Sequence, residues 1–187
     1  MEINLIWCQS ENNVIGQFVN DKFIMPWPHN KEDISNFKKL TTGDGSNAVL
    51  MGYNTWLSIG EKCLPNRENF VLTNNHYNEL NVLFDNEGNP NLVHPIVDID
   101  EAIATCEFLN IKQLWIIGGS TLYTMFLKDH RYASEVSKIY QTIIPSMYSV
   151  DSNTITIPDV PKSYFRLSKI DNLKTCQIRM YIGPNYQ

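Results

Sequence analysis

The sequence predicts an α/β fold: a single domain with a mainly parallel central sheet, an antiparallel C-terminal edge and helices on both faces. Three observations predict it. Short apolar runs alternate with helix-like segments, a pattern typical of parallel sheets whose strands are connected by helices. The last two apolar runs are separated only by a turn, which favours an antiparallel pair. The length of 187 residues fits one domain, 1–187, with a sizeable core.

The first half of the chain is expected to alternate strands and helices around one long loop. The elements are strand Ile3–Cys8, loop Asn13–Pro28, helix Lys31–Leu40, strand Ala48–Met51, helix Thr55–Ile59 and strand Phe70–Thr73. Apolar runs mark the strands, and clustered Gly, Asn, Asp and Pro mark the loop. Asn30 is a suitable N-cap for the first helix, and Gly43 follows shortly after its end.

The second half begins with a polar stretch, Asn74–Pro95, which we interpret as a connection with one short strand, Val82–Phe84, and an exposed loop. The later elements are helix Glu101–Phe108, strand Leu114–Ile117, helix Thr121–Lys128, strand Ser137–Ile144 and the closing pair Phe165–Ile170 and Cys176–Ile182. Asp98 is expected to cap the first of these helices, because Asp98-Ile-Asp-Glu101 resembles a capping box. The closing pair is expected to turn at Asp171-Asn172.

Composition excludes several function classes. The net charge of −5 and pI of about 5.3 give no basic face for nucleic acid. The four cysteines form no C-x-x-C pair and the four histidines show no ligand spacing, so we expect free thiols and no metal. The N-terminal MEINLIWCQS lacks a basic region, and no segment has the length of a membrane span. We therefore expect a cytoplasmic protein without a membrane partner.

The most informative segment is Met25–Leu40, read MPWPHNKEDISNFKKL. Asp33 and Phe37 lie one helical turn apart on one face, and Ile34 borders them. An acid between apolar walls suits a flat, nitrogen-rich ring, because a carboxylate can bind an amidine-like edge by two hydrogen bonds. The alternative is a solvated acid in a first helical turn, where the helix dipole favours it.

Two strand–glycine–helix units could bind phosphate. Gly118-Gly119 precedes one helix and the Gly52–Gly60 segment, GYNTWLSIG, contains the other. Helix N-termini present free N–H groups to anions, but no G-x-G-x-x-G occurs and close helix–sheet packing explains the glycines equally well. Thr55 could cap its helix or bind a phosphate. Arg67 could clamp a ligand carboxylate or be an ordinary solvated charge.

In their order and spacing these segments resemble the dihydrofolate reductase family. The matching pieces run from Ile3 to Asp151: LIWCQSENNVIG, MPW, Asp33 with Phe37 four residues on, MGYNTWLSIG, LPNR, WIIGG, YQT and later VDS. The resemblance implies NADPH-dependent reduction of 7,8-dihydrofolate to tetrahydrofolate, with hydride transfer to pterin C6 and protonation at N5, in thymidylate and one-carbon metabolism. We expect a monomer that binds antifolates such as methotrexate.

The resemblance also implies a substrate site. The pterin is expected across Ile6, Trp7 and Cys8, with Asp33 on its pyrimidine edge and Arg67 on the glutamate α-carboxylate. The remaining walls would be Ile34, Phe37, Ile59, Leu64, Ile117 and Tyr123. The implied catalytic group is Asp33, Thr142, Trp27 and Met25. In it, Thr142 and a water held by Trp27 support the acid, and water beside the Met25 loop protonates N5 because Asp33 is too distant.

For NADPH, the resemblance places Ile117 and Tyr123 beside the nicotinamide and a cis peptide at Gly118-Gly119. Asp151 matches an acid that bonds back to the loop near Gly16. The full implied cofactor set is Trp7, Cys8, Ile15, Gly16, Gly52, Tyr53, Asn54, Thr55, Leu72, Thr73, Asn74, Ile117, Gly118, Gly119, Ser120, Thr121, Leu122 and Tyr123, in which Thr55 and residues 120–122 hold phosphates.

The chain departs from the family pattern in three places. Tyr53, Asn54 and Thr121 stand where the family usually has basic residues for the adenosine 2′-phosphate, which leaves the preference for NADPH over NADH open. Thr73, Asn74 and Asn75 could still donate hydrogen bonds there, and His76 or Lys62 could add charge. The Gly16–Trp27 loop is longer than usual, and its Phe18 and Phe23 either cover the nicotinamide or pack outside. The expanded Asn74–Pro95 stretch shows no chemistry.

Three other functions remain possible from the sequence alone. One is a reductase of pyrimidine or pterin intermediates in riboflavin-type pathways, in which an arginine for a folate tail would have no role. Another is a non-catalytic binding or virion component, which the intact pterin-site positions disfavour. The third is a plain nucleotide-binding module, which an acid facing an apolar wall disfavours.

Overall fold

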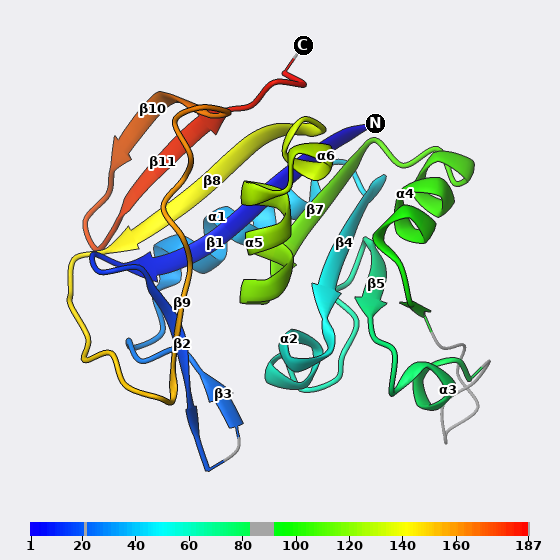
Figure 1. Ribbon diagram of the computed structural model, residues 1–187, viewed down its shortest axis with the longest axis horizontal. Helices are drawn as coiled ribbons and strands as arrows, with labels where there is room; N and C mark the ends of the chain where they lie inside the picture. The colour runs from blue at the N-terminus through cyan, green and yellow to red at the C-terminus, as the bar shows by residue number, and fades with distance from the viewer. Residues whose placement is uncertain (21, 83–91, 187) are drawn as a thin grey trace.

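The computed structural model describes residues 1–20, 22–82 and 92–186. Within them the main feature is an eight-stranded sheet with strand order β10-β11-β8-β1-β7-β4-β5-β6 (Figure 1). Its strands are β1 (Glu2–Ser10), β4 (Asn47–Gly52), β5 (Glu68–Leu72), β6 (Val93–Ile96), β7 (Gln113–Gly118), β8 (Val136–Ile144), β10 (Arg166–Asn172) and β11 (Gln177–Ile182). Neighbours from β8 to β6 are parallel, and β11 and β10 add an antiparallel edge. The predicted fold class is confirmed.

Helices cover both faces of this sheet, with α1 behind it and α5 and α6 in front of it in Figure 1. The helices are α1 (Lys31–Thr42), α2 (Tyr53–Ser58), α3 (Tyr77–Leu80), α4 (Ile99–Phe108), α5 (Ser120–Lys128) and α6 (His130–Ala133). Among the described residues, none of these helices has the length and apolar character needed to cross a membrane.

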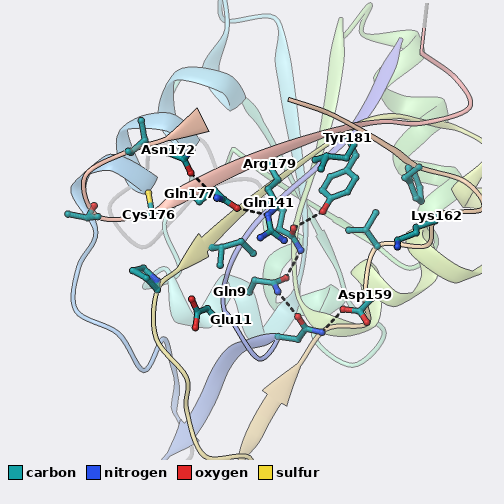
Figure 2. A pocket seen from close by; sticks show the side chains of 18 of the residues that line it. Gln9, Glu11, Gln141, Asp159, Lys162, Asn172, Cys176, Gln177, Arg179 and Tyr181 are labelled. Carbon is teal, nitrogen blue, oxygen red and sulfur yellow. Dashed lines mark hydrogen bonds between the residues drawn. The ribbon is translucent and has the colours of Figure 1, made fainter. Parts of the chain in front are cut away.

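The antiparallel edge leaves part of the front face without a helix. A groove of about 1180 Å³ lies there, and its lining includes Gln9 of β1, Gln141 of β8 and Arg179 of β11 (Figure 2). Asp159 and Lys162, from the chain segment that crosses in front of these strands, form another side. The floor of this groove is therefore polar, unlike the helix-covered part of the sheet.

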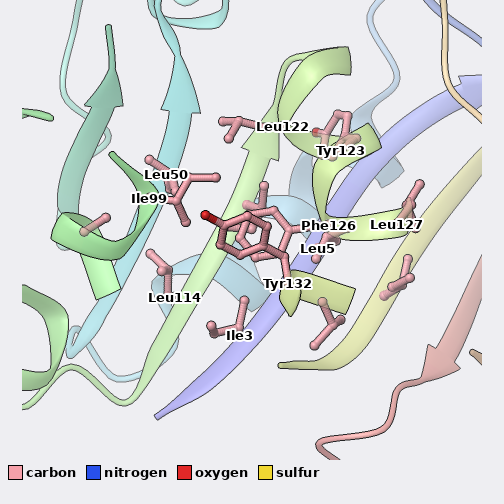
Figure 3. Close-up of a cluster of buried hydrophobic side chains, with 14 of the residues drawn as sticks. Ile3, Leu5, Leu50, Ile99, Leu114, Leu122, Tyr123, Phe126, Leu127 and Tyr132 are labelled. Atoms are coloured by element: carbon pink, nitrogen blue, oxygen red, sulfur yellow. The ribbon is translucent and has the colours of Figure 1, made fainter. Parts of the chain in front are cut away.

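Alternate strand residues build two separate cores. Leu5, Leu50 and Leu114 point toward α4, α5 and α6, where the buried cluster includes Phe126 and Tyr132 (Figure 3). Their strand neighbours Ile6, Val49 and Trp115 pack in a second cluster with Phe37 and Leu40 of α1. Successive residues of each strand thus point to opposite faces of the sheet, and both sets are apolar, as a parallel sheet covered on both faces requires.

The caps predicted for the helices are confirmed, and one of them places a candidate site residue. Asn30 Oδ1 accepts a hydrogen bond from the Asp33 amide at 3.0 Å, so α1 begins at Lys31 and Asp33 lies in its first turn. Gly43 ends α1 with φ +54°, in the left-handed region. Asp98 likewise accepts from the amide of Asp100 at the start of α4.

The prediction of an irregular loop over Asn13–Pro28 is wrong. The segment contains β2 (Val14–Val19) and β3 (Lys22–Ile24), which pair with β9 (Thr154–Thr156) in a three-stranded antiparallel sheet. Glycine, asparagine and proline made this stretch resemble a loop. Asn20, with φ +50°, instead lies at the end of the β2–β3 hairpin, where a left-handed residue is common. β9 is distant in sequence and was also missed.

Smaller elements differ for local reasons. β6 was missed because Pro95 interrupts it, but proline is tolerated on an edge strand. The short α3 and α6 have too few residues to show a helical period. Of the expected strand Val82–Phe84, Leu83 and Phe84 lie outside the described residues. β10 continues through Asp171-Asn172, so the closing turn falls at 173–176 rather than at the predicted pair.

Candidate active site

A cavity of about 530 Å³ opens near the carboxyl ends of β1 and β7, where α/β sheets commonly bind ligands. Its walls come from β1, β3, α1, α2 and the β7–α5 junction. Its lining residues are Ile6, Trp7, Cys8, Ile15, Phe23, Met25, Trp27, Pro28, His29, Asn30, Asp33, Ile34, Phe37, Thr55, Ser58, Ile59, Leu64, Ile117, Gly118, Gly119 and Tyr123. These are mainly apolar, so the cavity suits a largely apolar ring held by a few polar groups.

Asp33 is the only carboxylic acid among these lining residues. Burial raises the pKa of Asp33 above its usual value, and hydrogen bonds with Thr142 and Cys8 offset part of this effect. Thr142 and Cys8 face each other in the β8–β1 register, so both reach the acid from the sheet. An acid in this setting can bind the polar edge of a ring whose faces contact apolar side chains.

A stripe along α1 connects the acid to a cationic group. Asp33, Phe37 and Thr41 are spaced by four residues and share one helix face. Thr41 Oγ1 accepts a hydrogen bond from Arg67 Nη1, and the Arg67 Nε–H donates to the Pro65 carbonyl at 3.1 Å. Because Thr41 is eight residues after Asp33, the residue that contacts the guanidinium lies about 12 Å from Asp33 along the helix axis. Burial lowers the pKa of Arg67.

Two aromatic pairs support the back of the cavity. The Trp7 and Tyr123 rings have centroids 5.3 Å apart, and the Tyr123 hydroxyl donates to the Ile6 carbonyl at 2.8 Å. Burial raises the pKa of Tyr123 well above its usual value, with a further contribution from Asp33, so its hydroxyl stays protonated. Trp27 packs on Tyr148 with centroids 5.9 Å apart. These side chains hold fixed positions around the acid.

Two helix N-termini meet beside the cavity. Gly52 precedes α2 and Gly119 precedes α5, and neither helix start has a side-chain cap. The Gly118-Gly119 peptide is cis, as expected. A Cβ atom at Gly118 would lie 2.9 Å from Thr55 Oγ1, and one at Gly52 would lie 3.6 Å from the Gly119 nitrogen. The glycines keep these N-termini close together, with free N–H groups available to an anion.

The sequence model for dihydrofolate reductase matches residues 2–180. The chain belongs to the dihydrofolate reductase family. Metal-binding groups of three or more His, Cys, Asp or Glu are not found in the described parts of this family member.

Individual relatives agree with this family. A bifunctional dihydrofolate reductase-thymidylate synthase of Acanthamoeba polyphaga mimivirus is 28% identical over 177 residues, 90% of this chain but only 29% of the relative. The dihydrofolate reductase of Heliothis virescens is 32% identical over 174 residues, 89% of this chain and 84% of the relative. The chain therefore spans less than a third of its bifunctional relative and most of its insect relative.

A solved structure confirms the fold. The chain superposes with a TM-score of 0.68 on a dihydrofolate reductase from Enterococcus faecalis complexed with NADP(H) and RAB-propyl. The sequence identity is 24%, and the match covers 97% of this chain and 96% of the other.

Most of the residues predicted from the dihydrofolate reductase resemblance lie together. The cavity lining includes Ile6, Trp7, Cys8, Ile15, Met25, Trp27, Asp33, Ile34, Phe37, Thr55, Ile59, Leu64, Ile117, Gly118, Gly119 and Tyr123. Thr142 lies outside the lining but contacts Asp33. Arg67 also lies outside it, at the far end of the α1 stripe.

The other predicted cofactor residues do not line the cavity. Gly52, Tyr53, Asn54, Ser120 and Thr121 surround the two helix N-termini, and Leu72, Thr73 and Asn74 follow one another at the end of β5. The Leu122 side chain is 2% exposed within the front core, so only the Leu122 backbone would be available to a phosphate.

The expected adenosine end contains a ring stack rather than a cluster of cations. Tyr53 and His76 are stacked with centroids 3.8 Å apart and planes 4° apart. His76 Nδ1 lies 2.9 Å from Glu79 Oε2, so an acid accompanies the histidine that could have supplied charge. His76 is thus a weaker candidate for phosphate binding than an unpaired arginine would be.

The cavity lining also contains Pro28, His29, Asn30 and Ser58, which were not predicted. Phe23, for which covering the nicotinamide and packing outside were both left open, lines the cavity as well. Phe23 and Met25 are two residues apart in an extended segment, and Ser58 is one helical turn after Thr55, so both periods were available as signals. A Cβ atom at Gly16 would lie 2.2 Å from the Phe23 ring, so Gly16 allows this ring to lie against the backbone. Phe18 packs edge-on against Phe23 and does not line the cavity.

The expected bond from Asp151 to the loop near Gly16 is wrong. Asp151 Oδ1 accepts from the Asn153 amide at 2.8 Å and from Thr154 Oγ1 at 3.0 Å, within its own turn. The link to β2 is made by the main chain instead, where Gly16 pairs with Ile155 and the Phe18 amide donates to the Asn153 carbonyl at 2.9 Å.

Proposed function

We propose that residues 1–187 form one dihydrofolate reductase domain that reduces 7,8-dihydrofolate to tetrahydrofolate with NADPH. The observation that carries this proposal is the single carboxyl group of Asp33 in an apolar cavity, with Arg67 bonded to Thr41, about 12 Å further along α1. A reductase of riboflavin-type intermediates would have no use for this distant cation. Membership of the dihydrofolate reductase family supports the same reaction.

The substrate would be held at both ends. The Asp33 carboxylate accepts two hydrogen bonds from the amidine-like edge of the pterin, while Ile6 and Phe37 contact its faces. The acidic tail of dihydrofolate extends along α1 toward Arg67, whose guanidinium binds the glutamate α-carboxylate. Ile34, Ile59 and Leu64 form the intervening apolar wall. This arrangement explains why the acid and the cation lie at opposite ends of one helix stripe.

The second ligand, NADPH, fits the paired helix N-termini. Neither α2 nor α5 has a side-chain cap, and the backbone at Gly52 and Gly118-Gly119 has no Cβ atoms to block an approaching pyrophosphate. Thr55, Ser120 and Thr121 supply hydroxyl groups nearby. Trp7, Ile117 and Tyr123 line the same cavity as Asp33 and Gly118-Gly119. When bound, the cofactor supplies the hydride for pterin C6.

The chain's own residues position the pterin and admit a proton. Asp33, supported by Thr142, orients and polarises the pterin ring, which places C6 in the position that hydride transfer requires. Trp27 is buried beside Cys8 and would hold an ordered water near the acid. Met25 lines the cavity with 51% of its surface exposed, so solvent water reaches this side and delivers the proton to N5.

The remaining predicted properties extend the proposal. The net charge of −5 supports a protein without a nucleic-acid partner. Monomeric state, cytoplasmic location and the absence of a membrane partner stay predictions. A gel-filtration measurement of mass would test the first of them.

The decisive experiment follows the loss of NADPH absorbance with dihydrofolate, with Asp33→Asn alongside. Loss of the carboxylate is expected to lower turnover about a hundredfold, because the ring loses its orienting partner, while NADPH binding persists. Asp171→Asn on the outer strand β10 is the matched control and should behave as wild type. Equal turnover of Asp33→Asn and wild type would remove Asp33 from the mechanism. A folded wild type without turnover would overturn the proposal and direct the assay to a ribitylated aminopyrimidine.

A further inference from the structure

A buried glutamine lies directly behind the wall of the active-site cavity. Gln9 is 2% exposed, and its Oε1 accepts a hydrogen bond from Trp7 Nε1 at 2.7 Å. The same oxygen accepts from Gln141 Nε2 at 2.9 Å, and Gln9 Nε2 donates to Asn13 Oδ1 at 2.7 Å. Both ends of this amide are therefore engaged, which fixes its orientation.

The network continues outward into the open groove on the front face. Figure 2 shows Gln9 and Gln141 on its floor, where the Tyr181 hydroxyl donates to Gln141 Oε1 at 3.1 Å. On another side, Asn13 Nδ2 donates to Asp159 Oδ1 at 2.8 Å. Asn13 immediately precedes β2, so the network also reaches the base of the three-stranded sheet whose β3 supplies Phe23 to the cavity.

At its inner end the network contacts the ligand cavity through one side chain. Trp7 lines the cavity and packs against Tyr123, with ring centroids 5.3 Å apart. Tyr123 in turn donates to the Ile6 carbonyl. Its hydroxyl lies close to Gly118, because a Cβ atom added at Gly118 would be 3.5 Å from it. The indole orientation therefore sets the space available to Tyr123 and to the β7–α5 junction.

We infer that Gln9 is a positioning residue that fixes the Trp7 indole and, through Tyr123, the cofactor-facing wall of the cavity. Trp7 is buried, so rotating its indole away from Gln9 would leave Nε1 without an acceptor, at substantial cost. A fully satisfied buried network of this kind selects one side-chain arrangement. The inference rests on the proposed function, because it assigns this wall to NADPH.

The experiment compares Gln9→Met, which has similar length but no acceptor oxygen, with Gln9→Glu, which keeps the acceptor. In Gln9→Met the KM for NADPH is expected to rise about fivefold, with a smaller change in kcat. Gln9→Glu should stay within about twofold of wild type. Tyr181→Phe removes only the outermost hydrogen bond of the network and should leave both kinetic constants unchanged.

A spectroscopic signature separates positioning from general destabilisation. The Trp7 indole N–H resonance, assigned by its absence in Trp7→Phe, should move upfield in Gln9→Met and stay in place in Gln9→Glu and Tyr181→Phe. In the Trp7→Phe background, adding Gln9→Met should change the KM for NADPH by less than about twofold, because the interaction is already lost.

The outcomes are distinct. An unchanged indole resonance and KM in Gln9→Met, or equal losses in the Trp7→Phe background and in wild type, would overturn the inference. If Gln9→Met does not fold, the comparison of Gln9→Glu with Trp7→Phe decides: retention of NADPH affinity only in the former supports positioning, and loss in both contradicts it. A wild type that binds NADPH but does not reduce dihydrofolate would refute the proposed function alone, since the indole resonance and NADPH affinity still test Gln9.

Discussion

Replacing Arg67 by leucine tests the far end of the proposed substrate site. Charge-assisted hydrogen bonds contribute about 1.5–3 kcal/mol, which corresponds to roughly ten- to 150-fold in kcat/KM. Arg67 is only half-buried, so solvent screening places the expected loss near the lower end, about tenfold. The unfolding free energy should change by less than about 1 kcal/mol, because Thr41 Oγ1 still donates to the Phe37 carbonyl at 2.8 Å.

The assay compares dihydrofolate with a dihydropteroate substrate that lacks glutamate. Wild type should prefer dihydrofolate by about tenfold in kcat/KM, and Arg67→Leu should lose this preference while reducing the shorter substrate normally. Arg131→Leu is the matched control, because Arg131 is exposed and paired with Asp100 away from the cavity. An Arg67→Leu variant that keeps the full preference for the glutamate-bearing substrate would refute the placement of the tail along α1.

Three further outcomes are expected. Gly52→Ala should shift Tm by only a few degrees, because the added Cβ would lie 3.6 Å from the Gly119 nitrogen, an ordinary contact. The added methyl group should nevertheless raise the Kd for NADPH at least about fivefold, because it fills the approach to the N-termini of α2 and α5. A variant with wild-type affinity would contradict the assignment of these N-termini to the phosphates. The folded-state pKa of Asp33 is raised, so stability is lost as pH rises through it. The Tm of Asp33→Asn minus that of wild type should therefore grow as the pH rises above about 4, the usual pKa of an aspartate, and a constant difference in thermal melts would be inconsistent with a buried acid. Because Glu79 accompanies His76, the kcat/KM preference for NADPH over NADH should stay below about a hundredfold; a larger ratio would reveal a cationic partner elsewhere.

The parallel core could be predicted because its signals are local. Apolar runs such as Val49–Met51 and Leu114–Ile116 are buried in both phases, which is typical of a sheet covered on both faces. Helix starts were also predictable, because Asn30 and Asp98 cap their own helices through bonds spanning two or three residues. The sequence therefore contained the information that places Asp33 in the first turn of α1.

The candidate site was predictable where helical spacing or collinear motifs defined it. Asp33 and Phe37 follow from the helix period, and the two glycine-led helix starts follow from strand–glycine–helix order. Which of its two expected placements Phe23 takes could not be predicted, because it depends on the β2–β3 hairpin and on β2 pairing with β9, far along the chain. Leu122 was assigned from its place beside a phosphate-binding motif, whereas burial on the inner side of α5 determines where its side chain points.

The failed expectation for Asp151 shows what side-chain motifs cannot reveal. The match of Asp151 to an acid of the family pattern suggested a side-chain bond to the segment near Gly16, but the carboxylate accepts hydrogen bonds within its own turn. The connection is made by main-chain pairing of Gly16 with Ile155 and by the Phe18 amide on the Asn153 carbonyl. Main-chain bonds leave no trace in residue identity, since any residue but proline can donate them. Strand β2 is thus bound to β9 by several main-chain hydrogen bonds, so its position does not depend on the side chain of a single acid.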